Sequence, residues 1–151
     1  MHSLVRRYIK TAIAFLGVGL LIGLRLIVER DMLGRAPNVY ETSAHTHALL
    51  VGFVMMMILG VALWLFPRGG SEPRRYDPQL ASMAYWLLTT GTTIRVAGEL
   101  AKSSSNIAWI GWVVVAASVE QVAGIGLFFF TMWPRIRSAG SHVREAKGER
   151  F

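Results

Sequence analysis

The sequence predicts an all-α integral membrane protein, a bundle of four transmembrane helices with both termini in the cytoplasm. Apolar residues make up 53% of the 151 residues, and the mean hydropathy of +0.43 is too high for an ordinary water-soluble domain. The apolar residues gather in four stretches, each long enough to cross a membrane, because about 20 helical residues span a hydrocarbon core of about 30 Å. The basic residues gather mainly between these stretches.

The four predicted spans follow one another with short connections. They cover approximately residues 9–28, 44–66, 79–100 and 107–133. Residues 1–133 therefore form one transmembrane domain, and 134–151 form a basic cytoplasmic tail. Pro67 and Pro134 stop the second and fourth spans, since proline cannot continue a helix without losing a backbone hydrogen bond. Basic residues precede the first span, as in a signal peptide, but its longer apolar run and lack of a small-residue cleavage site predict that it is retained.

The distribution of Lys and Arg predicts the orientation. Basic residues are frequent before the first span, between the second and third spans, and after the fourth. The other two connections, 29–43 and 101–106, hold only Arg30, Arg35 and Lys102. By the positive-inside rule these two connections face outward, which predicts a multi-pass protein of the inner (plasma) membrane. The net charge of +7 thus reflects topology, and we expect no nucleic-acid partner.

The absence of cysteine narrows the chemistry. Without thiols the chain forms no disulfide, no thiolate metal site, no iron–sulfur cluster and no covalently attached c-type haem. Any metal held by this chain must therefore use His, Met, Glu or Gln side chains.

Several polar residues fall inside the predicted spans. A charged residue there costs about 2.5–3.5 kcal/mol on insertion scales, so each needs a partner, a cavity or a cofactor. Two lie near the middle of span four, Glu120 and Gln121. Five are expected at the outer ends of the first three spans: Arg25, His45, His47, Arg95 and Glu99. Because these five share one depth in the membrane, we expect them to form one site.

An alternative interpretation gives each residue a structural role. The arginine of span one would extend its charged end to the outer interface, and Arg95 and Glu99 would pair at i,i+4. The two histidines would be interfacial capping residues behind Thr42 and Ser43. Glu120 would bond another helix through its neutral form.

One face of span two suggests a ligand for a flat cofactor. At 100° per residue, this face carries His45, Leu49, Gly52, Met56, Leu59, Gly60 and Leu63. A macrocycle bound edgewise to a helix needs a nitrogen ligand and, about two turns along, a position without a side chain, which His45 and Gly52 provide. The alternative is that the glycines permit close helix packing. His47 lies about 200° from His45 around a regular helix, so the two cannot easily share one metal ion.

Residues 45–67 resemble the second helix of subunit I in haem–copper oxidases, and more closely NnrS, a haem- and copper-containing membrane protein associated with nitric oxide. The matching positions are His45, His47, Gly52, Phe53, Gly60 and Pro67. In those oxidases the leading histidine is an axial ligand of the low-spin haem, which implies that role for His45. The remaining histidines here, His2 and His142, are both expected in the cytoplasm, so an intact oxidase active site is absent.

The resemblance implies a membrane b-type haem protein that binds a diatomic gas, nitric oxide or oxygen, at iron ligated by His45. Arg25 and Arg95 would then bind the haem propionates. Glu120, with Gln121, would be a step of a proton route if the gas is turned over with an electron donor. Copper at His47, with Glu99 or another subunit's His47, is a further expectation.

Four helices surround a macrocycle only partly, so we expect a homo-oligomer, either a dimer or a trimer. Two alternatives stay open. One is an electron-transfer subunit in which His45 and a histidine of another chain ligate both faces of the haem. The other is a cofactor-free assembly or interaction subunit.

Overall fold

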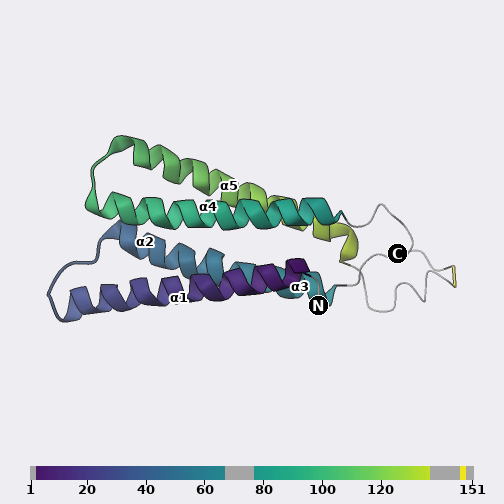
Figure 1. Cartoon of the computed structure of the whole chain (residues 1–151), viewed down its shortest axis with the longest axis horizontal. Coiled ribbons are helices and arrows are strands. Elements are labelled where there is room, and N and C mark those ends of the chain that lie inside the picture. Colours follow the sequence, from purple (N-terminus) through teal and green to yellow (C-terminus); the bar gives the residue numbers. More distant parts are fainter. Residues whose placement is uncertain (1–2, 67–76, 137–146, 149–151) are drawn as a thin grey trace.

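A computed structural model of the chain describes residues 3–66, 77–136 and 147–148. The helices in this part are α1 (Ser3–Asp31), α2 (Val39–His47), η1 (Ala48–Met55), α3 (Met56–Leu65), α4 (Pro78–Ser104), α5 (Ala108–Met132) and η2 (Trp133–Arg135). Because α2, η1 and α3 follow without a break, they form one rod, and four rods lie side by side (Figure 1). This confirms the predicted all-α, four-helix architecture.

Three of the four rods are long and apolar enough to cross a membrane: Ser3–Asp31, Val39–Leu65 and Ala108–Met132. The chain is therefore a membrane protein. α4 has 27 residues but is more polar, since it carries four threonines together with Arg95 and Glu99. It packs along α5 as the fourth rod, and the polar side chains it brings into the bundle are those of the candidate site.

The helices extend beyond the predicted apolar spans at the end where α1 meets α2. α1 continues to Asp31, and α2 begins at Val39, one residue after Asn38. The Asn38 side chain accepts a hydrogen bond of 2.9 Å from the Tyr40 backbone N–H, which makes Asn38 the N-cap. The alternative in which His45 and His47 are capping residues behind Thr42 and Ser43 is therefore wrong. Both candidate histidines lie inside the helix, where their side chains face neighbouring helices.

Other sequence predictions concern the opposite end of the bundle. The connection at 67–76, with Arg68, Arg74 and Arg75, lies outside the described residues, as does most of the predicted tail at 134–151. The α-helix of the fourth span ends at Met132, and Pro134 falls in the short 3₁₀ segment η2. The orientation of the termini stays a prediction.

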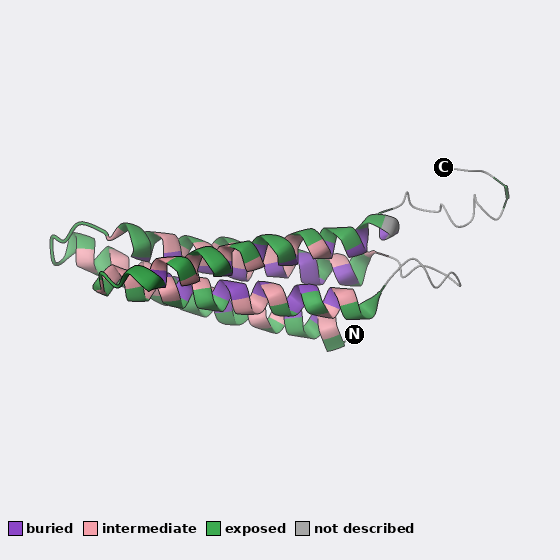
Figure 2. Ribbon diagram, turned by 90° about the horizontal axis from the view of Figure 1, so that it is seen from above, coloured by how far each residue is buried: buried purple, intermediate pink, exposed green. Residues whose placement is uncertain are grey.

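Aromatic and aliphatic side chains from all four rods fill the bundle near the start of α1. The Tyr8 ring packs edge-on against Tyr85 of α4 and Phe128 of α5, with ring centroids 5.1 and 5.9 Å apart. Tyr8, Phe128 and Met56 of α3 are fully buried. Buried residues line the contacts between the rods, whereas exposed residues face outward (Figure 2). Large apolar side chains dominate the exposed set, as expected for a lipid-facing surface.

Glycines bring α1 close to the α2–α3 rod. A Cβ atom on Gly52 would lie 2.7 Å from Phe15 Cβ, and one on Gly60 would lie 2.9 Å from Tyr8 Cβ. A Cβ on Gly23 of α1 would lie 3.0 Å from His45 Nδ1. His45, Gly52 and Gly60 therefore share one face, as predicted, and this face packs on α1.

The middle of the second rod is a π-helix. In η1 each backbone N–H bonds a carbonyl five residues earlier, so the register differs from that of an α-helix. η1 follows directly after His47 and contains Gly52. Such segments are frequent at functional sites, and this one changes how α2 is rotated relative to α3.

We expect Gly52→Ala to destabilise the protein by about 1–3 kcal/mol, because the added methyl group cannot fit against Phe15 without a shift of α1. Thermal unfolding in detergent measures this. Gly17→Ala is the matched control, since a Cβ there meets no atom within 4 Å. Equal stability of the two variants would contradict the close contact at Gly52.

Candidate functional site

The His45 imidazole is oriented by the backbone of α1. Its Nδ1 atom lies 2.8 Å from the carbonyl oxygen of Gly19. A carbonyl only accepts hydrogen bonds, so Nδ1 carries the proton and Nε2 keeps its lone pair. Histidines that bind metals are commonly held in this way, with one ring nitrogen fixed by a backbone carbonyl and the other available as the ligand. In the half-buried His45, Nε2 is therefore the ring nitrogen whose lone pair can bind a metal.

His47 is oriented by its own helix. Its Nδ1 atom lies 2.8 Å from the Ser43 carbonyl oxygen, so this nitrogen also carries the proton. The Ser43 hydroxyl oxygen lies 3.2 Å from the same atom, and Glu99 Oε2 of α4 lies 3.6 Å away. His47 thus faces α4, whereas His45 faces α1. The chain holds two imidazoles with available Nε2 atoms on two different sides of α2.

Glu99 is the centre of a polar network between α2, α4 and α5. Its carboxylate oxygen Oε1 accepts hydrogen bonds from Ser43 Oγ at 2.8 Å and from Arg95 Nε at 3.1 Å, which confirms the predicted i,i+4 pair. Its side chain is only 4% exposed. The second oxygen, Oε2, has no hydrogen-bond partner. The permanent counter-charge of the buried carboxylate is Arg95, and the His47 ring lies 3.6 Å from its second oxygen.

The network continues into α5 through Gln121. Arg95 donates from Nη1 to Gln121 Oε1 at 3.1 Å, and Gln121 Nε2 donates to Thr92 Oγ1 at 2.9 Å. Both polar atoms of the Gln121 side chain, Oε1 and Nε2, therefore form hydrogen bonds with side chains of α4. The result is a continuous path of side chains from His47 through Glu99 to the middle of α5.

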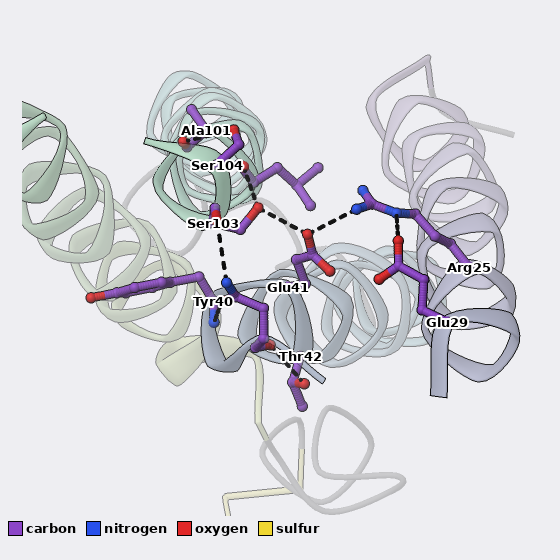
Figure 3. Close-up of polar contacts among 10 residues, drawn as sticks. Arg25, Glu29, Tyr40, Glu41, Thr42, Ala101, Ser103 and Ser104 are labelled. Carbon is purple, nitrogen blue, oxygen red and sulfur yellow. Dashed lines mark hydrogen bonds and ion pairs between the residues drawn. The ribbon is translucent and has the colours of Figure 1, made fainter. Parts of the chain in front are cut away.

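Arg25 belongs to a second cluster at the same end of the bundle (Figure 3). It donates from Nε to Glu29 at 2.8 Å and from Nη2 to Glu41 at 3.0 Å. The Glu41 carboxylate also accepts a hydrogen bond of 2.9 Å from Ser103 Oγ of α4. This cluster joins α1, α2 and α4. Arg25 is 56% exposed, so it keeps access to an external anion, although two carboxylates already bind it.

Glu120 lies apart from both clusters. Its side chain hydrogen bonds to the hydroxyl group of Thr90 in α4. The neighbouring Gln121 points into the network with Arg95, but no hydrogen bond joins the two side chains in the described residues. The two mid-span residues therefore belong to separate arrangements.

The His45 donor fits an axial haem ligand, but the space beside Gly52 is filled. The Phe15 side chain lies where a flat macrocycle was expected, and Tyr8 and Ile9 occupy the corresponding place at Gly60. In this structure Gly52 serves helix packing, as in the alternative interpretation.

Copper fits less well than haem. No group of three or more His, Cys, Asp or Glu side chains is placed to hold a metal ion within the described ranges. The His47 nitrogen that faces Glu99 carries the proton, so this pair does not form a metal site as it stands. The remaining donor of His47 is Nε2.

Sequence reasoning identified Arg25, His45, His47, Arg95 and Glu99 but missed several of their partners, both uncharged and charged. Gly19 and Gly23 position His45, and Ser43 binds both His47 and Glu99. The Gly19 and Gly23 pair is a small-xxx-small pattern, a recognised signal for close helix contact in membranes. Ser43 and Glu41 gave no comparable signal, because both lie outside the predicted apolar span.

Comparison with known proteins shows a family match over most of the chain. The family described as "Cytochrome C and Quinol oxidase polypeptide I" matches residues 3–143, which include all the described helices. A curated relative, the probable cytochrome c oxidase subunit 1-alpha of Streptomyces coelicolor, is 29% identical over 125 residues. The match covers 79% of this chain but only 22% of that protein. No solved structure matches the chain.

We expect Arg95→Met to destabilise the protein by about 3–5 kcal/mol, because it removes the permanent counter-charge of the buried Glu99 carboxylate and leaves only the His47 ring beside it. The double variant Arg95→Met/Glu99→Met should recover most of this loss, since no unpaired charge remains. Thermal unfolding in detergent checks both.

Arg30→Met is the matched control for this test. Arg30 and Asp31 form an exposed pair, so its loss should cost about 0–1 kcal/mol. A similar cost for Arg30→Met and Arg95→Met would show that the buried network contributes no more than a surface pair.

Proposed function

Because this chain belongs to the cytochrome c and quinol oxidase polypeptide I family, we propose that it is a membrane protein that binds a b-type haem through His45. Proteins of this family bind haem and copper. The chain spans 22% of the length of the curated relative, so the activity of a complete oxidase subunit is not transferred to it. A non-covalent b-type haem is consistent with the absence of cysteine.

The geometry of His45 is the observation that carries this proposal. The Gly19 carbonyl fixes the proton on Nδ1, and Gly23 leaves room for the ring against α1. The second ring nitrogen, Nε2, has no hydrogen-bond partner among the described residues. This nitrogen is therefore the one that can bind iron. His45 is thus both oriented and available.

Arg25 and Arg95 are the proposed partners of the haem propionates, and the structure separates them. Arg95 is 22% exposed and is engaged by Glu99 and Gln121, so it has little capacity for another carboxylate. Arg25 is 56% exposed and binds two carboxylates near the bundle surface. We therefore assign the main propionate contact to Arg25, in competition with Glu29 and Glu41.

The second axial position decides what the protein does. The described chain provides no second histidine near His45, because His47 faces α4 instead. A bound haem therefore keeps one side open for a diatomic gas, nitric oxide or oxygen, or receives a histidine from another copy in a homo-oligomer. The haem, when bound, supplies reversible gas binding and one-electron chemistry. Glu120 is our candidate proton donor for turnover with an external electron donor, and copper is assigned to Nε2 of His47 in the oligomer.

Electron transfer is the second candidate function, and the His47 geometry favours it. His47 also keeps Nε2 available, so a dimer or trimer can bring His45 of one chain and His47 of another to the two faces of one haem. Such a haem would not bind gas. The same orientation in the inner membrane, with both termini in the cytoplasm, fits either function.

We expect detergent-purified protein to show a Soret band that shifts when the reduced form is exposed to carbon monoxide or nitric oxide. His45→Ala should reduce the haem content to near zero because the iron loses its ligand, whereas His2→Ala should leave it near the wild-type value. His47→Ala should keep the haem and change only gas reactivity or copper content. Visible spectra and haem extraction measure these quantities.

Four results would contradict the assignment in different ways. Retention of a normal spectrum in His45→Ala would exclude His45 as the ligand, and loss of haem only in His47→Ala would transfer that role to His47. A haem spectrum indifferent to gas favours electron transfer. If the protein shows no Soret band even after reconstitution with haem, haem binding is excluded and the cofactor-free subunit is the remaining interpretation.

A further inference from the structure

Glu120 is an isolated acidic residue in the membrane-spanning region. It is the one charged residue of α5, Ala108–Met132. The elements packed against α5 carry few charges that face it: Arg95 and Glu99 of α4 bind each other, and Lys102 lies 4.9 Å from the Tyr40 ring centroid. Arg135 of η2 donates to backbone carbonyls of α3 and its C-cap, Leu63 and Phe66. No cation of the described residues forms an ion pair with Glu120.

The surroundings of Glu120 are apolar and face outward. The adjacent residues Val119 and Val122 are 64% and 71% exposed. Trp86, one turn before Thr90 on α4, is 54% exposed. Because these side chains face lipid in a membrane protein, the half-buried Glu120 carboxyl group lies at the border between the helix pair and the hydrocarbon.

The hydrogen bonds of Thr90 indicate the protonation state. The Thr90 hydroxyl group has one proton, yet it contacts two acceptors, the Trp86 carbonyl oxygen at 2.7 Å and Glu120 Oε1. An ionised Glu120 would have to share this one proton with the Trp86 carbonyl oxygen in a three-centre bond, as Glu41 shares the Ser103 proton with the Leu100 carbonyl oxygen. If Glu120 is a carboxylic acid, it donates to Thr90, and Thr90 donates to Trp86. Each group is then satisfied.

We propose that Glu120 and Thr90 form a proton-binding site open to the lipid, in which Glu120 is a neutral carboxylic acid and a site of modification by lipid-soluble carbodiimides. This site deepens the role given to Glu120 above. It is separate from the histidine end, because the network of Gln121, Arg95 and Glu99 does not include it.

The reaction with a carbodiimide tests whether Glu120 carries a proton. The acid transfers its proton to one carbodiimide nitrogen, and the carboxylate oxygen forms a bond to the central carbon. The acyl group of this O-acylisourea then migrates from oxygen to the neighbouring nitrogen, which gives a stable N-acylurea. No atom is lost, so the mass rises by one reagent molecule. In the hydrocarbon an ionised carboxylate has no proton for the first step, whereas a carboxylate in water takes this proton from the solvent.

The experiment uses the full chain in lipid nanodiscs, treated with dicyclohexylcarbodiimide and analysed by peptide mass spectrometry. We expect the main adduct on Glu120, at least about tenfold above that on Glu99. Glu99 is the internal control, because it is buried and paired with Arg95 in the same molecule. Glu120→Gln, whose amide can keep the Thr90 hydrogen bond, should lose the adduct and retain its thermal stability.

A water-soluble carbodiimide with an added amine gives the opposite pattern. It should modify Asp31, whose side chain is 54% exposed, and spare Glu120. The proposal is overturned if the lipid-soluble reagent leaves Glu120 unmodified, if it modifies Glu99 equally, or if the water-soluble reagent modifies Glu120 as well as Asp31. The His45→Ala variant separates this proposal from haem binding: it should lose haem and keep the Glu120 adduct.

Discussion

The close contact between α1 and the α2–α3 rod is the constraint on which the candidate site depends. Gly52 and Gly60 let α1 side chains approach the second rod, and Gly23 lets the His45 ring approach the first. In a bilayer, apolar burial does not drive helices together, so close packing and interhelical hydrogen bonds must do so. The contact also brings the Gly19 carbonyl to His45. The same packing that stabilises the pair therefore selects the histidine tautomer.

The polar residues follow the physical rule for charges in a membrane. The charges of the candidate site have specific partners: Arg95 with Glu99, and Arg25 with Glu29 and Glu41. Both clusters join several helices, so they hold α2 and α4 in place around the two histidines. Glu120 follows the other solution, a hydrogen bond without a counter-charge among the described residues. Gln121 and Glu120 are neighbours in α5, yet Gln121 joins the charged network through Arg95 and Glu120 bonds Thr90.

The two histidines give the chain its functional ambiguity. Each has Nδ1 fixed by a backbone carbonyl, but His45 faces α1 and His47 faces α4. One chain thus presents two ligands that do not converge. If haem binds as proposed, this arrangement is compatible both with a haem held by one histidine and with a haem shared between two chains.

The sequence by itself determined the class of protein, the rods and the Arg95–Glu99 pair, because apolar length and i,i+4 spacing are local properties. It also placed His45, Gly52 and Gly60 on one face. Only the tertiary structure decided what covers that face, since Phe15 and Tyr8 come from another helix. The Asn38 cap, the π-helix after His47 and the Ser43–Glu99 bond were likewise decided there. These features depend on contacts between distant segments, and no periodicity within one segment encodes them.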